Sequence, residues 1–200
     1  MCIRDSNFVG DALHSNPVIV SYDETSNGVA DRAVSFFMTN EGILHAVDDQ
    51  YFVNRNSNTA SEIFAYMPRE LLQNIQPLKM NTDNTAKIYG LDGPLVFYQE
   101  GGARNIAGNK YLFFGMRRGG MNYYGMDVTD PDNPSLMWTI QGGTGDFMEL
   151  GQSWSAPIIT NVDVGGTIKE VMVIGGGYDV DQDSTTAYQA DDQGLSLIHI

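Results

Sequence analysis

The fold of this chain is decided by residues 92–140, which read DGPLVFYQEGGARNIAGNKYLFFGMRRGGMNYYGMDVTDPDNPSLMWTI. A proline opens the first apolar run, at a position where a strand tolerates it best. A Phe-Phe run, a run ending in aspartate and an aromatic run then follow, with turns rich in glycine and asparagine between them. Short apolar runs separated by such turns indicate β-strands, so the stretch predicts a unit of four short strands.

The same order of elements occurs elsewhere in the chain. An earlier unit, at about 14–67, carries SNPVI at 15–19, FFMTNEG at 36–42 and IFAY at 63–66. A third unit starts near residue 153, with its second strand expected at 171–174. Repeated four-stranded units are typical of β-propeller blades, although a β-sandwich also has many short strands. We therefore predict an all-β fold, a partial β-propeller of about two and a half four-stranded antiparallel blades.

Two stretches depart from the strand pattern. PRELLQNI at 68–75 has proline at a helix-start position and apolar residues at helical spacing, which predicts a short inserted helix. Residues 54–61 are polar and predict a loop between strands. Because propeller blades bury their faces against neighbouring blades, two and a half blades would leave apolar surface uncovered, and we expect this chain to fold poorly by itself.

The charge excludes several classes of partner. The 200 residues include 25 acidic and 11 basic side chains, which gives a formal net charge of −14. Such a chain has little to neutralise nucleic-acid phosphates or an anionic membrane surface. The sequence also lacks an apolar run long enough for a membrane-spanning helix.

The two ends of the chain share one coding pattern. The last six residues, LSLIHI, can be encoded by CTGTCTCTTATACACATC, and the reverse complement of that DNA encodes Met1 to Asp5 and begins the Ser6 codon. The element resembles a transposase mosaic-end adapter. We therefore expect residues 1–6 and 195–200 to be adapter-encoded, and residues 7–194 to form one partial propeller domain. The sole cysteine, Cys2, would then lie outside that domain.

Several long blocks resemble one known family. GDALHSNPVIV at 10–20, RRGGMNYYGMDVTDPDNPSLMW at 117–138 and VIGGGYD at 173–179 occur in the order found in the C-terminal β-propeller of the PilY/PilC family. That family comprises tip-associated adhesins and assembly factors of type IV pili. The resemblance implies a secreted protein at the pilus tip or outer surface of a Gram-negative bacterium. It also implies pilus subunits or minor pilins as partners, a possible host or surface receptor, and a role in adhesion and in opposing pilus retraction.

A calcium site is a candidate in the third unit. Asp179, Asp181 and Asp183 alternate along one loop, and calcium prefers several hard oxygen ligands. An EF-hand loop would need glycine and glutamate where Ser184 and Ala190 stand, so the match is partial and a solvated acidic turn is the alternative. Residues 161–166 form a weaker acidic turn of the same kind. The family carries a propeller calcium loop, and we expect its equivalent in this protein beyond residue 194.

The other candidate side chains have structural interpretations. His14 and His45 lack a histidine or cysteine at metal-ligand spacing, so we expect both to be packed strand residues. Trp138 and Trp154 are expected in the core between blades, with sugar binding as the alternative.

Arg117 and Arg118 form a basic pair in an acidic chain. The pair could bind a carboxylate or phosphate ligand, but ion pairs with Asp127 or Asp130 are the favoured interpretation.

No motif argues for catalysis, so we predict a protein that is not an enzyme. Two other functions remain open. The first is a quinone-dependent dehydrogenase propeller, whose sequence repeat Ala46-Val47-Asp48 and Trp138 match in part. This chain lacks the complete tryptophan docking motif and the cysteine pair of those enzymes. A calcium-stabilised binding propeller of another function is the second alternative.

Overall fold

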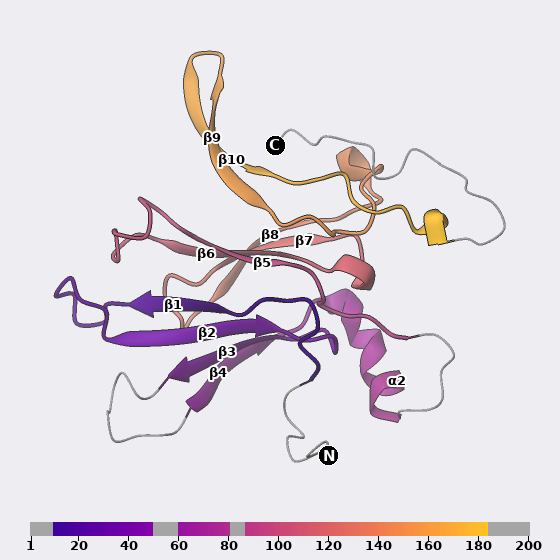
Figure 1. The fold of residues 1–200 in the computed structure, drawn as a ribbon, viewed down its shortest axis with the longest axis horizontal. Coiled ribbons are helices and arrows are strands. Elements are labelled where there is room, and N and C mark those ends of the chain that lie inside the picture. The colour runs from indigo at the N-terminus through magenta and orange to yellow at the C-terminus, as the bar shows by residue number, and fades with distance from the viewer. Residues whose placement is uncertain (1–9, 50–59, 81–86, 184–200) are drawn as a thin grey trace.

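The computed structural model describes residues 10–49, 60–80 and 87–183, which form two four-stranded antiparallel sheets and a hairpin (Figure 1). The first sheet has the order β1-β2-β3-β4, with β1 at Val18–Tyr22, β2 at Arg32–Met38, β3 at Leu44–Asp49 and β4 at Ala60–Tyr66. The second has the order β5-β6-β7-β8, with β5 at Leu95–Gln99, β6 at Lys110–Gly115, β7 at Tyr123–Asp127 and β8 at Ser135–Ile140. The hairpin pairs β9 at Ile158–Val164 with β10 at Thr167–Val173. The predicted all-β class and the predicted strand order are confirmed.

The two sheets repeat each other in detail. Both are meanders in which each strand pairs with the next along the chain. The register of the third and fourth strands shifts at one point in each sheet, between Ala46 and Val47 in β3 and between Gly125 and Met126 in β7. A shift at the same place in both sheets indicates that the repetition seen in the sequence is a repetition of structure.

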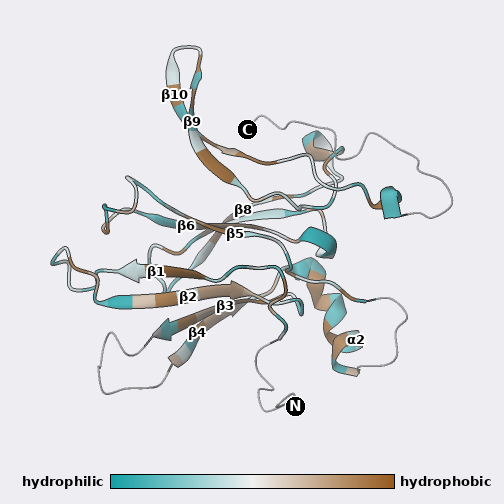
Figure 2. Ribbon diagram, in the orientation of Figure 1, coloured by the Kyte–Doolittle hydropathy of each residue, from teal (hydrophilic) through white to brown (hydrophobic). Residues whose placement is uncertain are grey.

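The core consists of two layers, one on each side of the second sheet. Because side chains alternate between the faces of a strand, Phe114 points toward the first sheet and Phe113 toward the hairpin. The larger cluster joins the two sheets, and the smaller one joins the second sheet to the hairpin. Figure 2 shows hydrophobic residues along β1 and at the base of the hairpin, consistent with these layers.

The predicted helix is present but longer and of mixed type. A 3₁₀ helix spans Arg69–Asn74 directly after Pro68, and the α-helix α2 continues from Ile75 to Met80. Pro77 falls in the first turn of α2, where a missing backbone N–H removes no helical hydrogen bond. Three other 3₁₀ turns occur in the described residues, at Arg117–Gly119, Gly145–Phe147 and Val180–Asp183.

The third unit differs from its prediction at the turn. Residues 161–164 are the end of β9 rather than a metal loop, and Gly165 and Gly166 alone turn the chain, at φ values of 62° and 84°. Such a two-residue turn needs positive φ at both positions, which favours glycine. As a result β10 begins at Thr167, earlier than the predicted 171–174. Of the predicted loop at 54–61, residues 54–59 lie outside the described part of the chain, and Ala60 and Ser61 belong to β4.

The turn at residues 116–120 has a close backbone contact that explains one of its glycines. A Cβ atom on Gly119 would lie 1.8 Å from the carbonyl oxygen of Gly90. Gly119→Ala should therefore lower the free energy of unfolding by about 1–3 kcal/mol or more, because the two backbone segments would have to separate. Urea unfolding followed by circular dichroism measures this.

Gly175→Ala is the matched control for Gly119→Ala. Its new methyl group would meet the Ser155 side chain at an ordinary contact distance of 3.4 Å. If the two variants had equal free energies of unfolding, the close contact between Gly119 and the Gly90 carbonyl would not be the reason that glycine is needed at position 119.

Candidate binding sites

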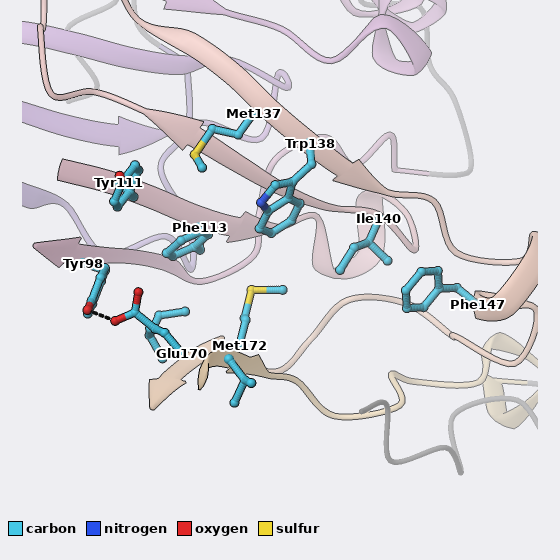
Figure 3. Close-up of a pocket in the computed structure, with 11 residues that line it drawn as sticks. Tyr98, Tyr111, Phe113, Met137, Trp138, Ile140, Phe147, Glu170 and Met172 are labelled. Carbon is cyan, nitrogen blue, oxygen red and sulfur yellow. Dashed lines mark hydrogen bonds between the residues drawn. The ribbon is translucent and has the colours of Figure 1, made fainter. Parts of the chain in front are cut away.

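A cavity of about 440 Å³ lies between the second sheet and the β9–β10 hairpin (Figure 3). Strands β5, β6 and β8 supply one wall and the hairpin supplies the other. Its lining is mostly aromatic and aliphatic: Tyr98, Tyr111, Phe113, Met137, Trp138, Ile140, Phe147, Ile159, Glu170, Val171 and Met172. This lining favours contact with an apolar surface.

Aromatic rings build the sheet wall of this cavity. Phe113 and Trp138 stack with their ring centres 5.6 Å apart, and Tyr98 stacks on Tyr111 at 6.4 Å. Trp138 packs against the smaller core cluster, so its predicted place between units is confirmed. Neighbouring strands bring these rings together because the residues share one face of the sheet.

The polar feature of the cavity is a hydrogen bond across it. The Tyr98 hydroxyl donates to the Glu170 carboxylate, which ties β5 to β10. This hydrogen bond raises the pKa of Tyr98 to about 12, so the phenol stays protonated at neutral pH. The site therefore presents an apolar surface with one polar edge, an arrangement suited to binding.

A second candidate site is a stack of cations and aromatic rings. The Arg117 guanidinium lies 4.4 Å from the centre of the Trp154 ring, and that of Arg118 lies 5.4 Å from it. Trp154 also packs on Tyr178, with ring centres 4.9 Å apart. Trp154 is thus half-buried against two arginines of the second unit and belongs to neither core cluster, so its predicted core position is wrong.

The predicted ion-pair partners of the two arginines are also wrong. Arg118 pairs with Asp183 at 2.6 Å, and Arg117 lies 3.6 Å from the buried Asp92. The two arginines lie just before the start of β7, whereas Asp127 is its last residue and Asp130 follows it. Both aspartates are therefore at the end of β7 that is distant from the arginines. The arginines therefore hold the third unit to the second through contacts that sequence spacing does not reveal.

The two candidate histidines, His14 and His45, have different surroundings. His45 is buried and stacks on Phe37 with ring centres 5.0 Å apart, so its predicted packed position is confirmed. Its Nδ1 lies 2.5 Å from Glu62, whereas its Nε2 is buried without a hydrogen-bond partner. His14 is exposed, which contradicts its predicted packing, since its Nδ1 reaches across to Asp92 at 2.7 Å.

Two of the three candidate calcium ligands, Asp179 and Asp183, have carboxylates that accept hydrogen bonds from protein groups. Asp179 accepts hydrogen bonds from the Asp181 backbone and the Gln182 side chain. Asp183 accepts them from Arg118 and from the Tyr178 hydroxyl, and both lower the pKa of Asp183. Within residues 10–49, 60–80 and 87–183, no three histidine, cysteine or acidic side chains gather at a point that could hold a metal ion. Calcium at these residues remains a prediction.

The predicted adapter-encoded ends, 1–6 and 195–200, lie outside the described residues. Among the helices that the structure describes, none is long and apolar enough to cross a membrane.

Comparison with known proteins identifies relatives of one kind. No family model matches the chain. It is 28% identical over 182 residues to the type IV pilus biogenesis factor PilY1 homolog of Xylella fastidiosa, which covers 80% of this chain and 14% of that protein. It is 26% identical over 197 residues to the type IV pilus biogenesis factor PilY1 of Pseudomonas aeruginosa, which covers 86% of this chain and 15% of that protein.

A solved structure is also similar. The crystal structure of the Pseudomonas aeruginosa PilY1 C-terminal domain matches with 25% identity and a TM-score of 0.49, covering 73% of this chain and 25% of that one. The relatives confirm the resemblance to the PilY/PilC family that the sequence blocks indicated. The chain spans only 14–15% of the length of these curated relatives.

Proposed function

We propose that this chain is a section of a type IV pilus biogenesis protein and that it acts through protein contacts rather than catalysis. The observation that carries the proposal is its similarity to two proteins named as type IV pilus biogenesis factors, over 80–86% of the chain. The apolar cavity with its single polar edge supports a contact role. The chain spans only a small part of the length of those relatives. The role of the whole protein in pilus biogenesis is therefore also proposed here, by extension from them.

The proposal has a structural part. The two sheets and the hairpin stack in sequence order, each unit packing one face on the unit before it. We infer that they are successive blades of a β-propeller, since blades of four antiparallel strands are the repeating unit of that architecture. Loops at the blade ends, including residues 101–109, would then present the surface for pilus subunits or minor pilins.

The finer role follows from the family resemblance. The resemblance supports a location outside the cell, at the pilus tip or outer surface of a Gram-negative bacterium, as part of this proposal. There it would stabilise pili against retraction and mediate adhesion to a host or another surface. The acidity of the chain supports a role without nucleic acid or a membrane as partner.

Calcium is part of the proposal in two places. We expect the principal calcium loop beyond residue 194, and a weaker site at Asp179, Asp181 and Asp183. Calcium would have to displace Arg118 from Asp183, so binding here should be weak. If the site exists, millimolar calcium raises the melting temperature of the chain, and Asp181→Asn abolishes the rise. An equal rise in the variant would contradict a site at these residues.

A chimeric protein tests the function. Residues 10–183 would replace the corresponding segment of Pseudomonas aeruginosa PilY1 in a strain that lacks its own copy. We expect surface pili, counted by electron microscopy after shearing, and attachment to a surface to be restored relative to the deletion strain. A chimera that is exported and accumulates at the normal level, yet yields no pili, would count against the proposal.

The chimera needs a control that separates folding from function. The same chimera with Gly119→Ala has a predicted folding defect and should fail through low protein level. A chimera with Gly175→Ala should behave like the parent chimera, because that glycine has room for a methyl group.

A further inference from the structure

A polar cavity of about 490 Å³ lies between the 3₁₀ helix at Arg69–Asn74 and the second sheet. The sheet contributes residues at the start of β7 and at the end of β8. Thr139 of β8 pairs with Tyr124, which places it on the face of the sheet turned toward the first unit. The cavity therefore borders the first and second units and neither end of the stack. Six polar side chains line it: Arg69, Glu70, Gln73, Asn122, Thr139 and Gln141.

The carboxylate of Glu70 is held in a fixed position on the wall of this cavity. The Tyr124 hydroxyl and the Asn122 side-chain amide both donate to its Oε1 atom. Burial, together with the hydrogen bond to Glu70, raises the pKa of Tyr124, so the phenol remains a donor at neutral pH. The Oδ1 atom of Asn122 accepts from the Gly142 backbone, which orients the amide. Because both bonds to Glu70 fall on Oε1, its Oε2 atom keeps its capacity to accept from a ligand.

The other four side chains of the lining have hydrogen-bonding groups without protein partners. Within residues 10–49, 60–80 and 87–183, none of these side chains makes a hydrogen bond or an ion pair: Arg69, Gln73, Thr139 and Gln141. Their polar groups are a guanidinium, a hydroxyl and two amides. The hydroxyl and the amides can both donate and accept, whereas the guanidinium only donates. A ligand in this cavity would therefore meet one fixed acceptor and several groups of mixed type.

A second polar cavity, of about 430 Å³ beside Tyr22, shows the contrast. The Lys110 amino group in its wall donates to the carbonyl oxygens of Ile106 and Gly108. The acidic side chains of that wall also accept hydrogen bonds from protein groups: Asp23, Glu24 and Asp130. The charged groups there serve the fold, whereas most polar groups of the 490 Å³ cavity are available to a ligand.

The chemistry of the lining favours one class of ligand. A protein partner normally anchors itself in an aromatic or aliphatic pocket, and none of the six lining side chains is of that kind. A phosphate group would face the Glu70 carboxylate beside the single cation, Arg69. A sugar ring without a charged substituent carries several hydroxyl groups, each of which donates and accepts. Such a ring can use the amides, the hydroxyl, the guanidinium and the carboxylate together.

We propose that this cavity binds an uncharged sugar ring of a glycan, with Gln73, Thr139 and Gln141 hydrogen-bonded to its hydroxyl groups. Glu70 accepts from a further hydroxyl, and Arg69 donates to a sugar oxygen. The volume falls within the range of about 300–1,000 Å³ typical of small-ligand sites. No aromatic ring lines the cavity to stack on the sugar, so a single sugar should bind with a Kd of about 1 mM. The proposal does not rest on a role in pilus biogenesis, and its test needs no pili.

Saturation-transfer NMR of the full 200-residue chain tests the proposal, with the methyl glycosides of glucose, galactose, mannose and N-acetylglucosamine as probes. We expect at least one of them to bind. It should bind more tightly than the methyl glycoside of glucuronic acid, because Glu70 and a formal net charge of −14 oppose a second carboxylate. If none of the neutral glycosides binds, the proposal is overturned, and binding of the glucuronide alone overturns it as well.

Two variants locate the bound sugar. Gln73→Ala and Gln141→Ala each remove an amide that the proposal assigns to the sugar, so each should raise the Kd about tenfold. Gln76→Ala is the matched control, because Gln76 is an exposed glutamine three residues further along the helical segment and lies outside the lining. It should bind the sugar like the parent chain. Binding that Gln76→Ala weakens equally, or that both other variants leave intact, would overturn the proposal.

Circular dichroism shows whether the parent chain and each variant are folded. All three glutamines are exposed, so their truncation should change stability by no more than about 0.5 kcal/mol. If the parent chain alone is unfolded, the same titrations are made on the purified chimera that carries residues 10–183. The comparison between Gln73→Ala and Gln76→Ala then assigns any binding to this cavity or excludes it.

Discussion

Replacing Arg32 with methionine should lower the free energy of unfolding by about 3–5 kcal/mol, because it leaves a buried carboxylate without its partner. Arg32 is 6% exposed and its Nε donates to Asp48 at 2.9 Å. Its terminal nitrogens donate to Glu24 in the first unit and to both carboxylate oxygens of Asp132 in the second. The hydrogen bonds to Asp132 are the main reason that the pKa of Arg32 is raised. Urea unfolding at neutral pH measures the loss.

Two further variants separate the buried charge from other effects of the substitution. Arg32→Met combined with Asp48→Leu removes both charges and should recover much of the lost stability, because an apolar pair needs no desolvated partner. Arg104→Met removes an exposed arginine and should change stability by no more than about 0.5 kcal/mol. If the double variant were as unstable as Arg32→Met, the buried-carboxylate explanation would be wrong.

The Arg32 network should also depend on pH. The hydrogen bond from Arg32 lowers the pKa of Asp132 below its ordinary value of 3.8. A carboxyl group with a lowered folded pKa contributes stability above its unfolded pKa, and that contribution is lost as the pH falls through the folded pKa. The stability gap between the parent chain and Arg32→Met should therefore narrow below pH 3.8. Because the Asp132 side chain is half-exposed, the narrowing should be small.

Phe114→Ala should cost about 3–5 kcal/mol, since it opens a cavity in the layer that joins the two sheets. Phe114 is fully buried, with its ring centre 5.1 Å from Tyr124 and 6.4 Å from Tyr66. Tyr66 belongs to the first sheet, so the substitution also loosens the contact between units. A loss of this size is a large share of the stability of a typical domain.

The matched control for Phe114→Ala is Leu136→Ala, in β8 of the same sheet. Leu136 is exposed, so its truncation should lower the urea midpoint only slightly. A midpoint for Phe114→Ala within error of that control would show that this layer does not stabilise the chain.

The strands could be predicted from sequence because their signals are local. Pro17, Pro94 and Pro157 each precede the first strand of a unit, and glycine-containing turns separate the others. Alternation places Phe113 and Phe114 on opposite faces whatever the neighbouring units do. The 3₁₀ start of the helix at 69–74 could not be predicted, since the two helix types share the same apolar spacing over one turn.

The sites were harder to predict than the strands. Tyr98 and Glu170 meet across the cavity although 72 residues separate them, and neither belongs to a recognisable motif. Asp92 was part of a strand-opening turn in the sequence, with no sign that it would be buried between His14 and Arg117. The donor and acceptor groups of these side chains predict that each needs a hydrogen-bond partner once it is buried. They do not predict which residue that partner is.

By itself, the sequence determined the strand order, the repetition of four-stranded units and the runs of consecutive apolar residues that put apolar side chains on both faces of a strand. Those properties depend on residues close together in the chain. Only the tertiary structure decided that Arg32 would meet Asp132, that both arginines of the 117–118 pair would cover Trp154, and that His14 would be exposed beside Asp92. These contacts join different units, so they depend on how the sheets stack, and stacking geometry has no local pattern in the sequence.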